Sequence, residues 1–477
     1  MLSWKLVTLI VCSFGFFKDL RPSEAYLTAY LTGPWKNLTE TEVDNEIYPW
    51  WTYSYLLWLL PMFLLTDYFR YKPILILDGV AYIVTWALLL WAQGVPAMKG
   101  MQVTYGLATA CEIGYYSYLY AVVTKDHFQK VASFTKAASL LGKFVAYLCG
   151  QLLVSFDVMD FFQLNIFSFV SVIIAFIITI ILPRAKHSEL FNPRIENSAT
   201  TPKSESVHEE SNADTGGGEK TAKSESTKEE KVVDTNNVSI SGPRSLIMFL
   251  FDEVKTIYAN KSVLIWSVWW AFASCGNFQV GNYIQNLWHI LTPYKNDRKQ
   301  RHLYNGAVEA AGTLFSSGTV LLVGFLPIDW SVRGRCEVLM AAVCGLNAAM
   351  LIIMGKTTSI WVCYVLYDVF RATYQIVITI ATAQIAEHLS RQRYGFVFGC
   401  NTFLALLIET ILTAIVVDES GLDVDIQTQF MVYGGYFAVM TGAFLTVAIV
   451  TIVRSRTTHR RFYNIGSNEA NLQTTQT

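Results

Sequence analysis

Charged residues are scarce in this chain. Only 15% of its 477 residues are Asp, Glu, Lys or Arg, whereas 53% are hydrophobic and 14% are aromatic. Soluble domains carry about a quarter charged residues, so this composition indicates a membrane protein. The formal net charge is −1, which is not the basic excess typical of nucleic-acid-binding proteins. We therefore expect the lipid bilayer as a partner, and no nucleic acid.

Paired cysteines and histidine clusters are missing as well. The eight cysteines stand singly, nearly all within apolar runs, and no CxxC pair or histidine cluster suggests a metal site. The seven histidines fall mostly in predicted loops, linker and tail, and no nucleophile has a base or metal ligand at a usable spacing. The sequence gives no reason to expect an enzyme, a bound metal or a cofactor.

Long apolar runs, by contrast, are frequent. Runs of about 20 residues, enough to cross roughly 30 Å of hydrocarbon, occur about six times before position 185 and about six times after position 246. The segment between them is rich in Ser, Thr, Glu, Lys and Gly and nearly lacks aromatic residues, so we expect it to be disordered. The predicted organisation is an N-terminal six-helix bundle at 1–185, a cytoplasmic linker at 186–245, a C-terminal six-helix bundle at 246–456 and a cytoplasmic tail at 457–477.

This pattern predicts an all-α membrane protein of the major facilitator type, with about twelve transmembrane helices in two six-helix bundles and a cargo site between them. Basic residues border the loops on the linker side, which predicts that both termini are cytoplasmic. One loop, YKNDRKQRH, is basic and dissents from that topology. The sequon at Asn37 falls in the first outward loop, where we expect a glycan.

A few ionisable residues fall at predicted membrane depth, where a charge costs roughly 2.5 kcal/mol or more and needs a partner, a water-filled cavity or a cargo. They are Glu112, Lys143, Glu309, Arg371 and Glu409. The structural alternatives are ion pairs, Glu112 with Lys143 and Arg371 with Glu409, and a helix-terminus role for Glu309.

The first apolar run, near 5–30, is itself interrupted by charge. Arg21 and Glu24 lie three residues apart on one helical face. An ion pair with a structural role and a binding site are both open for these two residues.

Aromatic residues and amides occur in the run that contains Glu112 and in two other runs. Tyr115 lies one helical turn after it, Tyr48 and Trp51 belong to the second run, and Asn282 lies in the seventh. Aromatic faces attract cations and buried amides give directional hydrogen bonds. This set of groups favours a flat, cationic, nitrogen-rich cargo, although interfacial aromatic belts are the plainer explanation for part of it.

Several long motifs resemble the reduced folate and thiamine carriers of solute carrier family 19. They are RPSE from Arg21, GPWKNLT from Gly33, NEIYPWWTYSYL from Asn45, LTDYFRYKP from Leu65, YNGAVEA from Tyr304 and VFGCNTF from Val397. The resemblance implies a major facilitator fold and uptake of a water-soluble vitamin at the plasma membrane. It also places Glu24, Tyr48, Trp51, Tyr115 and Asn282 on positions that line the thiamine pocket.

The resemblance bears on the choice of vitamin. Thiamine carriers have a glutamate before a Tyr-Tyr pair, as EIGYY has at Glu112, whereas the folate carrier has arginine there. Glu409 stands where folate carriers have lysine and thiamine carriers glutamine. Arg371 matches an arginine of the folate carrier, and Lys143 adds a cation that neither group shows. We therefore expect a thiamine carrier with Glu112 as the counter-charge. The alternatives are a reduced folate carrier with Lys143 and Arg371 as the anion site, and a vitamin-sensing receptor in a transporter fold.

Overall fold

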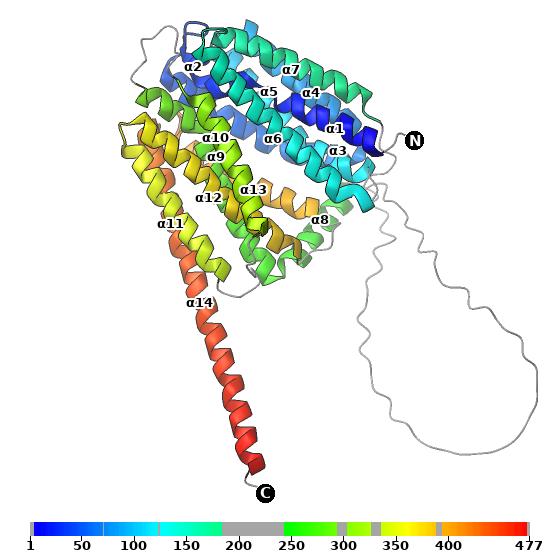
Figure 1. Ribbon diagram of the computed structural model, residues 1–477, viewed down its shortest axis with the longest axis vertical. Helices are drawn as coiled ribbons and strands as arrows, with labels where there is room; N and C mark the ends of the chain where they lie inside the picture. The colour runs from blue at the N-terminus through cyan, green and yellow to red at the C-terminus, as the bar shows by residue number, and fades with distance from the viewer. Residues whose placement is uncertain are drawn as a thin grey trace, which may run out of the picture.

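The computed structural model describes residues 4–69, 71–122, 125–183, 243–292, 303–325, 335–387 and 394–474, and these residues form helices joined by short connections (Figure 1). No strand occurs among them. In a bilayer, only a structure that satisfies its own backbone hydrogen bonds is stable, and the α-helix does so within a single segment. Most of the expected linker, up to position 242, and several of the basic residues that predict the orientation, such as Arg70 and Arg184, lie outside the described ranges.

In the described part of the first half, six helices have 16 residues or more and three elements are short. Its elements are α1 (Trp4–Asp19), η1 (Pro22–Tyr26), α2 (Leu27–Thr32), η2 (Glu42–Ile47), α3 (Pro49–Tyr68), α4 (Lys72–Trp91), α5 (Val95–Val122), α6 (Lys125–Ser155) and α7 (Phe161–Ile181). Within this half, α4 and α3 both pack against α5, and α1 packs against α6 and α7.

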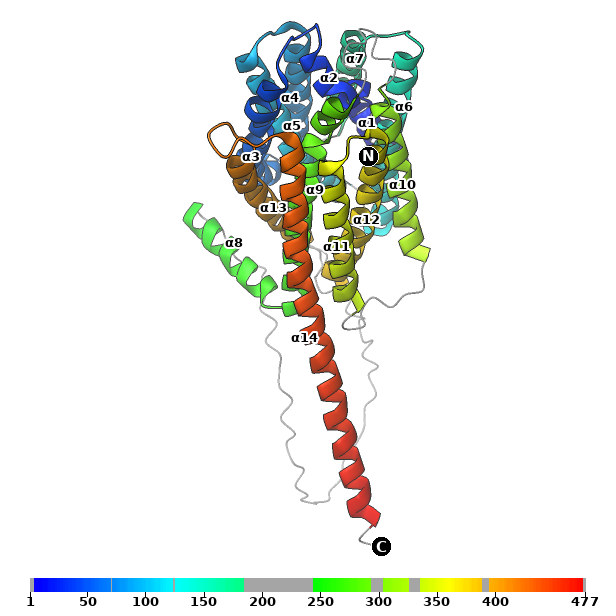
Figure 2. The ribbon, with the colours of Figure 1, turned by 90° about the vertical axis from the view of Figure 1, so that its left-hand side faces the viewer.

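Among its described residues, the second half contains six helices of 21 residues or more, preceded by α8 with 16 residues. Its elements are α8 (Pro243–Tyr258), α9 (Lys261–Leu291), α10 (Asn305–Phe325), α11 (Arg335–Lys356), α12 (Ile360–Glu387), α13 (Tyr394–Val416) and α14 (Ile426–Thr474). The two halves form neighbouring bundles, coloured blue to cyan and green to red (Figure 2). They meet where α6 packs against α10 and where α3 packs against α13.

The predicted spans agree with these helices, with three differences. The first span is broken, because α1 ends at Asp19 and a 3-10 turn that begins at Pro22, which has no backbone donor, separates it from α2. The helix α8 is not among the predicted spans, and it stands apart from the bundle (Figure 2) with exposed Met248 and Phe251. Finally, α14 continues to Thr474, whereas the sequence predicts a tail from position 457.

Six of the described helices are apolar and long enough by themselves to cross a membrane. They are α4, the 133–155 part of α6, α7, α11, α13 and the 426–453 part of α14. Several of the other long helices carry the polar side chains of the candidate site, such as Lys18 in α1, Glu112 in α5 and Arg371 in α12. These helices bury polar groups inside the bundle, which lowers their hydropathy.

Candidate functional site

An ion pair in the first half contains Glu112, the predicted counter-charge. The Lys18 ammonium donates to Glu112 Oε1 at 2.7 Å, and it lies 5.3 Å from the centre of the Tyr115 ring. The Lys18 side chain is only 4% exposed, whereas the Glu112 side chain is 33% exposed. The pair therefore presents its acidic partner to open space and buries its basic partner.

The break after α1 positions a second ion pair beside the first. Arg21 lies 3.1 Å from the Glu24 carboxylate, and Tyr105 donates its hydroxyl to Glu24 Oε1 at 2.8 Å. The Arg21 guanidinium also lies over the rings of Tyr82, Trp86 and Tyr105, at 4.7, 5.4 and 5.9 Å from their centres. Of the two alternatives for Arg21 and Glu24, the structure thus contains the ion pair, and an aromatic cage surrounds its cation.

Tyr115 lies in the core of the first half and does not line an open surface. Its side chain is buried, its hydroxyl donates to the backbone carbonyl of Val11 at 3.1 Å, and its ring meets Phe14 edge to face at 5.1 Å. Its contact with the binding region is the Lys18 ammonium.

Tyr48 and Trp51 stand at the start of α3 with their polar atoms engaged. The Tyr48 hydroxyl is 2.8 Å from Thr28 Oγ1, and its ring lies 6.2 Å from that of Tyr283 in the other half. Trp51 Nε1 donates to Thr109 Oγ1 at 3.3 Å, one turn before Glu112 on α5. Trp51 is thus placed near Glu112, and Tyr48 at the contact between the halves.

The second half has an ion pair of its own. Arg371 Nη1 donates to Glu309 Oε2 at 2.6 Å, and the Tyr367 hydroxyl donates to Glu309 Oε1 at 3.2 Å. Here the cation is the more open partner, since the Arg371 side chain is 24% exposed and that of Glu309 is 11% exposed. Arg371 pairs with Glu309, so the suggested pair of Arg371 with Glu409 does not occur. A role for Glu309 limited to the helix terminus is also not needed.

Glu409 lies at the contact between α3 and α13 and is completely buried. Its Oε1 accepts hydrogen bonds from Asn282 Nδ2 at 3.0 Å and from Thr52 Oγ1 at 3.3 Å, while Oε2 has no partner in the described part of the chain. In this state the side-chain amide of Asn282 is therefore hydrogen-bonded to the Glu409 carboxylate. Because Thr52 belongs to the first half and Glu409 to the second, this carboxylate joins the two halves.

A seam of hydrogen bonds joins the halves at the end of the bundle that contains η2 and the connection between α13 and α14. Asp44 in η2 accepts from Asn286 Nδ2 at 2.9 Å and from Gln429 Nε2 at 3.2 Å. Tyr53 donates to Asp418 at 2.8 Å, and Asn45 donates to Asp423. Burial raises the pKa of Asp44 to about 7, against the lowering effect of its two amide donors. This end of the structure is closed.

Outside the seam, buried ionisable residues form three groups: one in the first half, one around Arg371, and Glu409 by itself. Within the described residues, each group contains one more carboxyl than it contains cations. The first-half group comprises Asp19, Glu24, Asp78 and Glu112 with Lys18, Arg21 and Lys143. The second-half group comprises Glu309 and Asp368 with Arg371, and Glu409 stands without a cation. An added positive charge is therefore better accommodated than an added negative one.

Sequence reasoning missed three of these residues. Lys18 follows the run KLVTLIVCSFGFF and resembles a flanking residue, whereas Asp78 and Asp368 each interrupt an apolar run and were detectable as such. The suggested partner of Glu112, Lys143, lies on α6, and Asp19 and Glu112 are the carboxylates that act most strongly on it. The ion pair of Glu112 is formed with Lys18 instead. Asn37 is exposed in the connection between α2 and η2.

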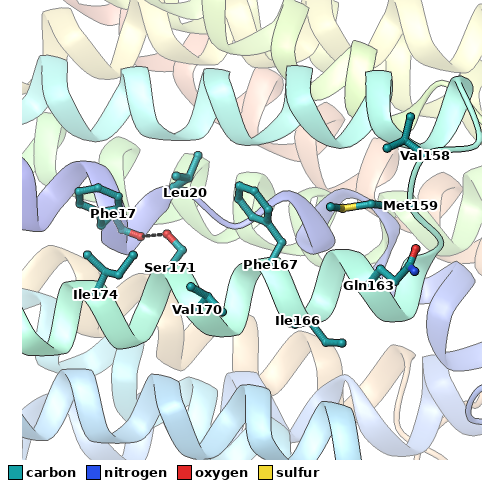
Figure 3. A pocket seen from close by; sticks show the side chains of 10 residues that line it. All are labelled: Phe17, Leu20, Val158, Met159, Gln163, Ile166, Phe167, Val170, Ser171 and Ile174. Atoms are coloured by element: carbon teal, nitrogen blue, oxygen red, sulfur yellow. Dashed lines mark hydrogen bonds between the residues drawn. The ribbon is translucent and has the colours of Figure 1, made fainter.

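A cavity of about 540 Å³ lies elsewhere, between α7, the end of α1 and the connection that precedes α7 (Figure 3). Its lining is almost entirely apolar and includes Phe17, Phe167 and Ile174; Ser171 in that lining donates to the backbone carbonyl of Phe17 at 2.8 Å. None of the predicted site residues lines it. Its lining contains no charged side chain and a single amide, that of Gln163, so it lacks the counter-charge that a cationic cargo needs.

The chain is similar to known transporters over nearly its whole length. The reduced folate carrier family model matches residues 2–432. Human thiamine transporter 2 is 42% identical, over 93% of this chain and 90% of that protein, and mouse thiamine transporter 1 is 43% identical, over 94% and 91%. Folate transporter 1 of Caenorhabditis elegans is 36% identical, over 94% and 93%.

Among solved structures, the nucleoside transporter NupG superposes with a TM-score of 0.58 at 12% identity, covering 92% of this chain and 98% of that one. This likeness shows the fold alone, and it confirms the predicted major facilitator architecture. The family resemblance is confirmed as well. The chain belongs to the reduced folate carrier family.

Proposed function

We propose that this chain carries a vitamin across the plasma membrane by alternating access and that the vitamin is thiamine. The observation that supports this most is the polarity of the first-half ion pair, in which Glu112 is the open partner and Lys18 the buried one. The thiazolium ring of thiamine is permanently charged and cannot shed a proton to enter a buried site. It therefore needs a carboxylate, and the relatives named as thiamine transporters make the same cargo the first to test.

In this proposal the other predicted residues surround the carboxylate. Trp51 lies near Glu112 through Thr109, and its ring offers a face for a cation. Tyr48 and Asn282 lie at the contact between the halves, where they are bonded to Thr28 and Glu409. Thr28 donates across this contact to Asn286 and Glu409 accepts across it from Thr52, and these two bonds must break when the halves separate. Rocking of the two bundles about this site then exposes the cargo to one side at a time.

The proposed orientation places the linker and both termini in the cytoplasm, so that the closed seam faces the outside. The exposed Asn37 then lies in an outward loop. We expect Asn37→Gln to remove a glycan and to shift the mobility of the protein on a denaturing gel without changing uptake. A wild-type protein whose mobility does not respond to glycosidase would contradict this orientation or this site.

A reduced folate is the second candidate cargo. The observation that favours it is the second-half pair, where the cation Arg371 is more exposed than its acid, together with the additional cation Lys143. A folate carries carboxylates that a basic pair can bind. The excess of carboxyls in each of the three groups of buried ionisable residues argues against it.

Paired uptake assays decide between the two cargoes. In cells without endogenous uptake, labelled thiamine and labelled 5-methyltetrahydrofolate are each measured alone and with the other as competitor. Saturable thiamine uptake that folate does not inhibit supports the proposal, whereas folate uptake without thiamine uptake rejects it in favour of the Arg371 site. Binding of thiamine without counterflow in reconstituted vesicles would indicate a receptor rather than a carrier.

A further inference from the structure

A buried carboxyl without a partner lies close to the Lys18–Glu112 pair. Asp78 on α4 has no exposed surface, and neither of its oxygens has a hydrogen-bond partner among the described residues. A buried carboxyl that makes no hydrogen bond is costly, and so is one left without a cation. Its presence therefore calls for a state of the protein in which it gains a partner.

The surroundings of Asp78 show which partner that is. Tyr82, one turn along the same face of α4, packs against the Arg21 guanidinium at 4.7 Å, so this face is turned toward the end of α1. Among charged groups, Lys18 acts most strongly on Asp78. On the α5 side, Asp78 is also the charged group that acts most strongly on Cys111, the neighbour of Glu112. Asp78 thus faces the space between Lys18 and the Glu112 segment of α5.

Lys18 is able to move between the two acids. Its ammonium ends a flexible four-carbon stem, and it already interacts with both Glu112 and Asp78. Asp19 also acts on Lys18, but it follows Lys18 in the chain, where side chains do not face each other, and it lies 3.6 Å from Arg21. Asp78 is the acceptor whose oxygens are both unused.

From this geometry we infer that Lys18 is a tethered cation that competes with the cargo for Glu112, and that Asp78 receives Lys18 when the cargo takes its place. The inference rests on the proposed function, because it requires a positively charged cargo. Lys18 keeps Glu112 neutralised while the site is empty, and its transfer to Asp78 gives the cargo cation an open carboxylate. Lys18 and Asp78 are then positioning residues that set the affinity for a cation.

The test is a double-mutant cycle on thiamine uptake, measured in the full chain with surface expression of each variant. Lys18→Met removes the competitor, so we expect the concentration for half-maximal uptake to fall by about tenfold or more, given the coupling between close buried charges. Asp78→Asn removes the acceptor, so we expect that concentration to rise by about tenfold. In the Lys18→Met background, Asp78→Asn should have no further effect.

Two controls separate charge competition from damage to the fold. Lys99→Met removes a cation paired with Glu46 at 2.8 Å in another part of the chain, and it should leave the half-maximal concentration unchanged. An uncharged thiamine analogue, with thiophene in place of thiazolium, should inhibit the wild type and Lys18→Met at equal concentrations. The inference is wrong if Asp78→Asn raises the half-maximal concentration for thiamine equally with and without Lys18. It is also wrong if Lys18→Met increases the affinity for the uncharged analogue as much as the affinity for thiamine.

The proposed function and this inference fail in different ways. If the wild-type protein does not take up thiamine, both the proposed function and the inference are rejected. If the wild-type protein takes up thiamine but the effects of Lys18→Met and Asp78→Asn are additive, only the inference is rejected.

Discussion

The two halves of the molecule hold similar ion pairs in opposite senses. In the first half, Glu112 is 33% exposed and its partner Lys18 only 4%. In the second half, Arg371 is 24% exposed and its partner Glu309 only 11%. Both pairs are close, at 2.7 and 2.6 Å, so distance alone does not distinguish them. What a pair offers to a cargo is decided by which partner faces the open space.

This difference gives the ion pairs of the two halves opposite polarity. The first half presents an acid, near Trp51, and the second half presents a base beside Tyr367. A cargo with a cationic ring therefore fits the first half, whereas an anionic group on the same or another cargo fits the second. Variants that remove one partner or both partners of each pair test this asymmetry.

The largest effect is expected from Glu112→Gln. This change removes the carboxylate that pairs with the cargo cation, and losing one partner of a buried charge pair costs about 2–5 kcal/mol. We expect the efficiency of thiamine uptake to fall by about thirtyfold or more. Uptake is measured together with surface expression, so that a folding defect is recognised. Retained saturable uptake at normal affinity would remove Glu112 from the mechanism.

Neutralising a whole pair in each half tests the asymmetry directly. Replacing both partners of a buried pair by neutral residues is often close to neutral for stability, so the fold should tolerate it. Arg371→Met with Glu309→Gln should change thiamine uptake by less than about threefold, within the roughly 1 kcal/mol of a minor contact. The matched double variant, Lys18→Met with Glu112→Gln, should abolish it. Equal losses in the two double variants would show that the halves do not differ in their role.

The sequence is sufficient to predict most of the long helices and which charges fall within them. Apart from the broken first span and the extended α14, runs of apolar residues set the helix ends to within a few residues, because the thickness of a bilayer fixes the length of a span. Glu112, Glu309, Arg371 and Glu409 are recognisable because a charge within such a run stands out.

The partners of these charges could not be read from the sequence. Glu112 pairs with Lys18, which is 94 residues away, and packing of α1 rather than any local pattern brings them together. Lys18 falls inside the predicted first run, near 5–30, and only the break after Asp19 places it in the last turn of α1, beside that break. In the same way, the pairing of Arg371 with Glu309 depends on how α10 packs against α12.

A third test concerns the seam of hydrogen bonds around Asp44, which must open before water and cargo can enter between the two halves from that end. The pKa of Asp44 is raised to about 7 in the closed seam from an ordinary value of 3.8, chiefly by burial. At a pH between these two pKa values, Asp44 is protonated in the closed seam and ionised in an open one. Acidification over this range therefore stabilises the closed form, and above about pH 7 this stabilisation disappears. We expect uptake to fall as external pH drops below about 7, by up to about tenfold per pH unit.

Asp44→Asn should remove this dependence, because an amide does not titrate. The matched control is Asp425→Asn at the start of α14, where hydrogen bonds from Thr428 hold the pKa of Asp425 below its ordinary value. That carboxyl is ionised throughout the range tested, so its replacement should leave the pH profile unchanged. A profile that is the same in the wild type and in Asp44→Asn would assign the pH dependence to another group.

The smallest effects are expected from trimming one phenol in each half. Tyr105 donates its hydroxyl to Glu24 at 2.8 Å, and Tyr367 donates its hydroxyl to Glu309 at 3.2 Å; each supports the acid of an ion pair with an arginine. Tyr105→Phe and Tyr367→Phe remove one such bond, worth roughly 1.5–3 kcal/mol when the acceptor is charged. Because Arg21 remains within its aromatic cage and Glu112 is untouched, we expect thiamine affinity to fall less than about fivefold in Tyr105→Phe, and in Tyr367→Phe to stay within about twofold. A larger loss in Tyr367→Phe than in Tyr105→Phe would reverse the assignment of the cation to the first half, since the more affected phenol marks the half on which the cargo depends.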